Sequence, residues 1–202
     1  MEDIRKSQFI LASASPRRRD LLTKAGYCFE IVPSSVDESA YDTNGISSEE
    51  HTNILALAKA NDVAARFPNA VVVGSDTVVD LDGEIIGKPD DADHAEEITR
   101  KLFSRPHKVI TGLALVCIDK GIEIVEADTT IVYPRQLTEA QIADHITHGQ
   151  WQGKAGAYGI QETGDEFVER IDGSFTNVMG LSMERTQRLL GELDIHPTEP
   201  RQ

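Results

Sequence analysis

The chain has 202 residues, with 34 Asp and Glu against 20 Lys and Arg, which gives a formal net charge of -14 at pH 7. Because 40% of the residues are hydrophobic and 27% are charged, the composition is that of an ordinary globular protein. The acidic balance argues against non-specific binding to nucleic acid or to anionic membranes. The apolar runs are too short to span a bilayer, so we expect a cytoplasmic protein.

The hydrophobic pattern predicts strands that alternate with helices, together with two hairpins. In chain order these are strand 9–12, a helix between Ser15 and Gly26, strand 29–32, helix 52–66, strand 70–73, a short hairpin turning at Asp82-Gly83, helix 91–103, strands 109–118 and 122–133, helix 138–148 and helix 182–190. Pro16 suits a first helical position and Gly26 a C-terminal cap. Residues 138–141 form a capping-box pattern.

This order of elements predicts an α/β fold with a mixed twisted sheet and flanking helices, rather than a purely parallel sheet. We expect one domain over residues 1–195, either a single unit or two lobes around a central cleft. The tail at 196–202 is expected to be flexible. Cys28 and Cys117 stand far apart without a CxxC pattern, which favours reduced structural thiols over a disulfide or a zinc site.

Three consecutive arginines, Arg17 to Arg19, fall in the first turn of the first predicted helix. Cations are unfavourable there because the helix dipole already places positive charge at that end. A bound anion would remove the conflict, so the helix N-terminus with Ser13 and Ser15 is a candidate phosphate cradle. The helical spacing places Arg17 and Arg18 beside the buried face and Arg19 in water. The alternative is three solvated arginines.

Asp76 follows the predicted strand 70–73 at the end where α/β sheets commonly bind ligands. A carboxylate there is suited to hold a divalent cation or to activate water, and a turn-capping role is the alternative. Lys59 lies at the margin of an apolar stripe on its predicted helix. It is either a cation of the site or a lysine whose aliphatic stem covers apolar surface while its ammonium reaches water. Lys88 closes the first hairpin, from which its side chain reaches back over the same strand ends.

Further polar residues are weaker candidates. Asp37 and Glu38 are adjacent acids that could join Asp76 in holding a hard cation through oxygen ligands, or they form a solvated acidic loop. Gln161 follows a run of small residues and offers a donor and an acceptor to a base edge, unless it faces water. We interpret His145 and His148 as surface residues, because they share a helix face with no acidic partner.

Four separated motifs resemble those of the Maf family of nucleoside triphosphate pyrophosphatases, and the resemblance spans nearly the whole chain. The motifs are Leu11 to Arg18, Gly74 to Val79 with Gly87-Lys88-Pro89, Ala155 to Gln161, and Phe167 to Leu181. The resemblance implies a Maf/inosine-triphosphatase-like fold. It also implies hydrolysis of a nucleoside triphosphate between its α- and β-phosphates, with a divalent metal such as Mg or Mn.

The resemblance also implies roles for single residues. Ser13, Arg17, Lys59 and Lys88 would hold the triphosphate, and Asp76 would be the catalytic acid–base residue. Arg17, Thr77 and Gln161 match the branch of the family that acts on dTTP and UTP. Two departures are mild: Gly74-Ser75-Asp76 replaces a more usual Gly-Ala-Asp, and Glu162 follows Gln161 where a Gly is usual.

Three alternatives stay open at this point. The same chemistry could act on a modified nucleotide such as 7-methyl-GTP, which is the substrate of the sister branch. The chain could instead sense dTTP or UTP without turnover, as a regulator of septum formation. It could also be a monophosphate phosphatase, which would release orthophosphate. The sequence leaves a monomer and a homodimer equally open.

Overall fold

The computed structural model describes residues 7–41, 45–149, 151–160 and 167–198. The strands are β1 (Phe9–Leu11), β2 (Phe29–Ile31), β3 (Val72–Leu81), β4 (Glu84–Ile86), β5 (His107–Cys117), β6 (Ile122–Pro134) and β7 (Val168–Asp172). The helices are α1 (Pro16–Lys24), α2 (Ser48–Ala64), α3 (Ala92–Leu102), α4 (Glu139–Thr147), α5 (Phe175–Met179) and α6 (Met183–Glu192). Short 3-10 turns occur at Glu38–Ala40, Ile118–Lys120 and Ala155–Ala157.

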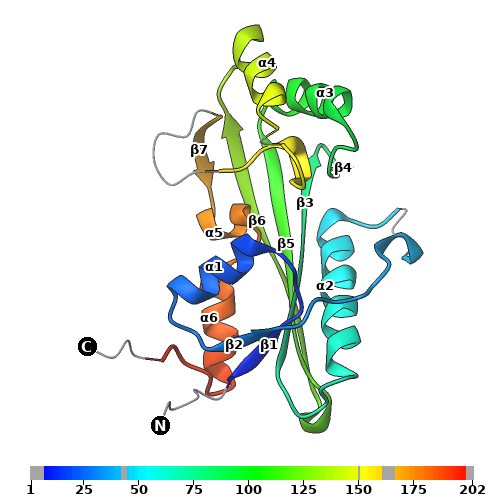
Figure 1. The fold of residues 1–202 in the computed structure, drawn as a ribbon, viewed down its shortest axis with the longest axis vertical. Coiled ribbons are helices and arrows are strands. Elements are labelled where there is room, and N and C mark those ends of the chain that lie inside the picture. Colours follow the sequence, from blue (N-terminus) through cyan, green and yellow to red (C-terminus); the bar gives the residue numbers. More distant parts are fainter. Residues whose placement is uncertain (1–6, 42–44, 150, 161–166, 199–202) are drawn as a thin grey trace.

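These strands form one mixed sheet in the order β2-β1-β3-β5-β6-β7, with β4 paired to β3. β1 is parallel to both β2 and β3, and the remaining pairs are antiparallel. Figure 1 shows the long strands β3, β5 and β6 running most of the length of the molecule, with helices on both sides. The predicted fold class, a mixed sheet with flanking helices, is confirmed.

The two faces of the sheet bury different side chains because successive residues of a strand point to opposite sides. On one face, Phe9 and Leu11 pack with leucines of α1 and α6. On the other face, Ile10 and Ala12 pack against small residues of α2. Figure 1 accordingly places α2 on one side of β3 and β5, and α1 and α6 on the opposite side.

Helix α2 lies unusually close to the sheet because two glycines face it. A Cβ atom on Gly74 would come within 2.3 Å of the Ala56 carbonyl oxygen, and one on Gly112 within 2.3 Å of the Thr52 carbonyl oxygen. Gly112 is the direct cross-strand partner of Asp76. The close approach therefore sets the position of α2, and of the side chains it carries, beside Asp76.

We expect Gly112→Ala to destabilise the protein by about 2 kcal/mol, the usual cost of forcing an extra group into a filled core. The three atoms nearest to the added methyl group are backbone atoms of α2, so the helix must shift. Urea unfolding measures the change. Gly87→Ala is the matched control, since a Cβ there meets nothing within 4 Å, and equal stability of the two variants would contradict the close-packing argument.

A separate hydrophobic cluster fills the end of the molecule that carries α3 and α4. It includes Val79, Leu102, Phe103 and Tyr158. His107, at the start of β5, is buried beside this cluster, and its Nε2 lies 2.6 Å from the Tyr158 hydroxyl oxygen. Burial lowers the pKa of His107 to about 4, from an ordinary value of 6.5.

This depressed pKa predicts a loss of stability in mild acid. Between pH 6.5 and 4 the unfolded chain binds a proton at His107 that the folded chain does not, so the free energy of unfolding falls as the pH falls. Down to pH 5 the loss from this group is about 2 kcal/mol. Urea unfolding measured at several pH values should therefore show that the free energy of unfolding depends less on pH in His107→Gln than in the wild type. The same pH dependence in both proteins would contradict the expectation.

Several expected elements differ in extent. The expected strand 70–73 begins only at Val72 and continues into the first arm of the hairpin as one strand, β3, so Asp76 lies within a strand rather than after it. Helix α2 begins at Ser48, earlier than residue 52, with Ser47 as its N-cap. The expected capping box at Thr138 is present. At the C-terminal end, the Thr198 N–H donates to the Gly26 carbonyl, so ordered contacts extend past residue 195.

The interpretation of His145 as a surface residue was wrong. His145 is only 4% exposed, and its ring packs against Phe167 with centroids 4.8 Å apart. His148, one turn beyond, is exposed as expected. Cys28 and Cys117 form no disulfide with each other. None of the helices in the described ranges has the length and hydropathy of a membrane span.

Candidate active site

The main cavity of the protein opens where one edge of β3 lacks a strand partner. β1 pairs with Val72 and Val73, and β4 pairs with residues 79–81. Within the described residues, no strand covers residues 74–78 on that side. The gap lies at the carboxyl end of β1, and such positions in α/β sheets commonly bind ligands.

The cavity reaches both faces of the sheet through this gap, so neighbouring side chains of β3 that point in opposite directions both line it. Asp76 and Thr77 are such a pair. The cavity has a volume of about 660 Å³, large enough for a nucleotide-sized ligand. The described part of its wall carries five basic side chains, Arg17, Arg18, Lys59, Lys88 and Lys154, and two acidic ones, Glu38 and Asp76.

The N-terminus of α1 forms one wall of the cavity. Ser13 is buried in the turn after β1, and its hydroxyl oxygen accepts hydrogen bonds from the Ser15 N–H and from Arg18. Arg17 lines the cavity, and burial lowers the pKa of its guanidinium. Ser15 occupies the N-cap position, but its side chain makes no capping hydrogen bond. A partly desolvated cation at a helix N-terminus is the arrangement expected of an anion site.

Arg18 is directed into the protein instead. Its Nε donates to the Gly180 carbonyl oxygen at 2.8 Å, and its Nη1 donates to the Ser75 carbonyl oxygen at 2.7 Å. Its Nη2 donates to the Thr77 hydroxyl oxygen at 3.1 Å. Burial lowers the pKa of Arg18 to about 10. Arg18 thus ties α1 to β3 and to the segment before α6, a role that the sequence did not reveal.

Lys59 and Asp76 form an ion pair at the bottom of the site. The Lys59 ammonium lies 2.7 Å from Asp76 Oδ1 and 2.7 Å from Glu38 Oε1. The Lys59 and Asp76 side chains are only 13% and 10% exposed, whereas Glu38 is 52% exposed. Lys59 and Asp76, which were both expected at the site, are therefore in contact. The Lys59 ammonium also bridges two carboxylates that come from distant parts of the chain.

Two further lysines line the cavity. Lys88 lies in the loop after β4, and Lys154 precedes the turn at Ala155–Ala157. Burial lowers the pKa of Lys154, and the nearby charge of Arg17 lowers it further. Lys154 directly precedes the motif at Ala155 to Gln161, and no local pattern in the sequence indicated a role for it. The crowding of Lys154 and Arg17 marks a place where an anion would be favourable.

The other expected site residues have different placements. Thr77 is held through its hydroxyl, which contacts Arg18 and lies 3.0 Å from the Thr111 hydroxyl. Asp37 caps the 3-10 turn at Glu38–Ala40 and accepts hydrogen bonds from Ser39, and it is not among the described residues that line the cavity. Gln161 lies outside the described residues.

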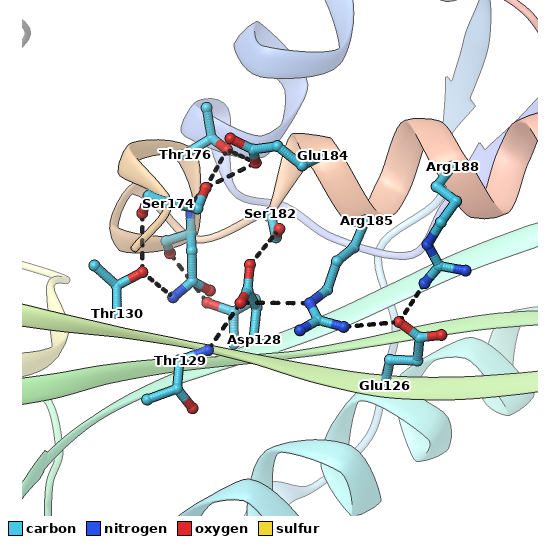
Figure 2. A network of polar contacts seen from close by, with 12 residues as sticks. Glu126, Asp128, Thr129, Thr130, Ser174, Thr176, Ser182, Glu184, Arg185 and Arg188 are labelled. Atoms are coloured by element: carbon cyan, nitrogen blue, oxygen red, sulfur yellow. Dashed lines mark hydrogen bonds and ion pairs between the residues drawn. The ribbon is translucent and has the colours of Figure 1, made fainter. Parts of the chain in front are cut away.

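A polar network on β6 holds the start of α6, and the residues just before α6 line the cavity. Figure 2 shows Asp128 of β6 joined to Ser182 and Arg185, while Glu126 joins Arg185 and Arg188. These contacts hold the start of α6 against the sheet. Met179 and Gly180, which precede α6, line the cavity, and the Gly180 carbonyl is the one that Arg18 contacts.

The two carboxylates of the site could bind a hard divalent cation, because both already contact the same positive charge. Glu38 and Asp76 flank a single position of positive charge, now taken by the Lys59 ammonium. Mg²⁺ in proteins usually binds one or two carboxylates together with substrate phosphates and water, rather than a full protein cage. No group of three His, Cys, Asp or Glu suited to a metal occurs in the described part of the chain. The residues present therefore fit a metal that is shared with a phosphate ligand.

Comparison with protein families identifies the chain. The family model described as Maf-like protein matches residues 8–193, which covers β1 through α6. The chain belongs to the Maf-like family. The membership expected from the four separated motifs is thereby confirmed, and those motifs line or support the cavity of this Maf-like chain.

Two curated relatives show what the Maf-like chain is similar to. The chain is 38% identical over 185 residues to a dTTP/UTP pyrophosphatase of Ruminiclostridium cellulolyticum, which covers 92% of this chain and 95% of the relative. It is 43% identical over 178 residues to a dTTP/UTP pyrophosphatase of Geotalea uraniireducens, which covers 88% and 91%. Among solved structures, the Ham1 protein of Staphylococcus aureus aligns at a TM-score of 0.43 and 16% identity, over 63% of this chain and 72% of that one.

Proposed function

We propose that this Maf-like chain is a nucleoside triphosphate pyrophosphatase that converts dTTP and UTP to the nucleoside monophosphate and pyrophosphate. The observation that carries the proposal is the carboxylate of Asp76, which sits in a cavity rich in basic side chains although the protein as a whole is acidic. The relatives named as dTTP/UTP pyrophosphatases support the choice of substrate.

The cavity wall carries both cationic and apolar side chains, as a nucleotide requires. Arg17, Lys59, Lys88 and Lys154 would contact the triphosphate, with Ser13 as a hydroxyl donor. The apolar lining residues Val79, Val109, Ile160 and Val178 would contact the sugar and base. Gln161 would read the base edge beside Ile160, and Arg17 and Thr77 would help to select dTTP and UTP. We place this reaction in the cytoplasm.

In the proposed reaction a water molecule attacks the α-phosphorus. Asp76 accepts a proton from that water as the new P–O bond forms. The bond from the α-phosphorus to the oxygen that bridges the α- and β-phosphates then breaks, and pyrophosphate leaves with the electron pair. Lys59, Lys88 and Lys154 neutralise the charge that gathers on the leaving group, which is the main catalytic task in phosphoryl chemistry.

Asp76 and Glu38 would hold a Mg or Mn ion together with phosphate oxygens. Such an ion, when bound, neutralises phosphate charge and polarises the phosphorus under attack. Asp37 is left out of this ligand set because its carboxylate is engaged in capping. The Lys59 ammonium would have to share or give up its two carboxylate partners when substrate and metal enter.

The test is turnover of four nucleotides, dTTP, UTP, 7-methyl-GTP and dATP, with Mg or Mn. We expect pyrophosphate and a monophosphate from dTTP and UTP, with the other two slow. Pyrophosphate from 7-methyl-GTP alone would keep the chemistry and overturn the substrate assignment. Tight binding of dTTP without any product would favour the regulatory alternative.

A further inference from the structure

The segment from residue 152 to 160 supplies much of the cavity wall without being a regular element. Residues 152–155 and 158–160 all line the cavity, and among them is the cation Lys154. The segment turns at Gly156 with φ of +71° and at Ala157 with φ of +61°. A residue with a Cβ rarely adopts the left-handed conformation unless its surroundings impose it.

Two buried histidines from other elements hold this turn. His145 of α4 places its Nε2 2.8 Å from the Ala157 carbonyl oxygen, so the ring donates to the residue with the unusual φ. His107 of β5 places its Nε2 2.6 Å from the hydroxyl oxygen of Tyr158. The two histidines are 4% and 3% exposed, and neither is among the described residues that line the main cavity.

The same turn is joined to the loop that carries another site cation. The Gly156 N–H donates to the Gly87 carbonyl oxygen at 3.0 Å, and Gly87 directly precedes Lys88. A Cβ on Gly156 would lie 2.8 Å from Val79 Cγ2 and 3.0 Å from Leu102 Cδ1, so the turn is also packed tightly against the core. A shift of the turn would therefore displace both Lys154 and the Lys88 loop.

We propose that His107 and His145 are positioning residues that clamp the 155–158 turn and thereby set Lys154 and Lys88 against a bound triphosphate. Neither imidazole lines the main cavity, and neither is assigned a contact with the substrate. His145 does line a smaller pocket that shares Arg17 and Lys154 with the main cavity. Each acts on the turn through a hydrogen bond of its ring Nε2, His107 to the Tyr158 hydroxyl and His145 to the Ala157 carbonyl. The proposal rests on the proposed function in that a nucleoside triphosphate is the ligand.

The first test compares, at each histidine, a variant that loses the hydrogen bond with a variant that keeps a polar group able to make it. His107→Leu and His145→Leu delete the hydrogen bond, whereas His107→Gln and His145→Gln keep a polar group near the Nε2 position. Binding of α,β-methylene-dTTP, which resists cleavage at the bond in question, is measured by calorimetry. We expect each Leu variant to weaken binding by about fivefold, the size of one lost hydrogen bond, and each Gln variant to recover most of it.

Controls separate positioning from loss of fold. His148→Gln alters an exposed histidine of the same helix and should bind as the wild type does. If His107→Leu fails to fold, Tyr158→Phe carries the test for that histidine, because it keeps the ring and removes the hydroxyl that His107 contacts. We expect Tyr158→Phe to raise KM for dTTP by about fivefold with kcat within about twofold.

Folded Leu and Phe variants that bind the analogue as tightly as the wild type would overturn the clamp. Weaker binding that the Gln variants do not recover would also overturn it, since general loosening would then explain the effect. A wild-type protein that binds the analogue but releases no pyrophosphate from dTTP would refute the proposed function alone, because the clamp is judged from binding.

Discussion

Replacement of Asp76 by Asn is expected to lower kcat for pyrophosphate release by a factor of about 10² to 10⁴, the range typical for loss of a general base. The amide has almost the same shape as the carboxylate, and Lys59 keeps its contact with Glu38. The fold should therefore survive, and the thermal midpoint should change little. The rate is measured from pyrophosphate released from dTTP under saturating substrate.

Asp20→Asn is the matched control for this experiment. Asp20 is an exposed residue of α1 whose partner is the exposed Arg19, so its amide variant should turn over dTTP at the wild-type rate. If the Asp76 variant were folded and equally fast, the carboxylate would not be the proton acceptor, and the proposed chemistry would be wrong at its centre.

Replacement of Arg18 by Met is expected to destabilise the protein by at least about 3 kcal/mol, because several buried acceptors would lose a charged donor at once. The carbonyls of Ser75 and Gly180 are the most affected, since Arg18 approaches both within 2.8 Å. Urea unfolding measures the loss. kcat/KM should also fall, because the Gly180 segment and the β3 backbone beside Asp76 would no longer be tied together.

The neighbouring arginine provides the control. Arg19 is half-exposed, and its ion pair with Asp20 lies on the surface, so Arg19→Met should alter stability by less than about 1 kcal/mol. If Arg18→Met were as stable as Arg19→Met, the hydrogen bonds of Arg18 would contribute little, and its inward orientation would have no structural role.

The local features of the fold could be predicted because they depend on neighbouring residues. Pro16 begins α1, the capping box opens α4, and Gly121 adopts the left-handed conformation between β5 and β6. Such signals need no tertiary information. The alternation of strands with helices, together with the hairpins, also indicated a mixed sheet with flanking helices.

The continuity of β3 could not be predicted for a physical reason. Asp76 and Thr77 interrupt its apolar run, and polar residues in that pattern ordinarily indicate a turn. Here their polarity serves the cavity instead, which opens where β3 has no neighbour between β1 and β4. Local rules tend to fail at functional sites because such sites carry residues that the fold alone would not select.

Contacts between distant segments could likewise not be predicted from the sequence. Glu38 and Lys59 are brought together by the course of the chain around α2, and nothing local indicates their ion pair. His145 did carry a signal, since it follows the buried Ile142 by three residues and so shares its helix face. Lys154 directly precedes the motif at Ala155 to Gln161, but only the fold shows that it lines the cavity close enough to Arg17 to feel its charge.

The most direct test of the account is hydrolysis of dTTP in water enriched in oxygen-18, followed by mass spectrometry of both products. Attack by water on the α-phosphorus predicts one labelled oxygen in dTMP and none in pyrophosphate. Label in pyrophosphate would place the attack on the β-phosphorus, away from the position assigned to Asp76. Labelled orthophosphate would contradict the pyrophosphatase reaction altogether.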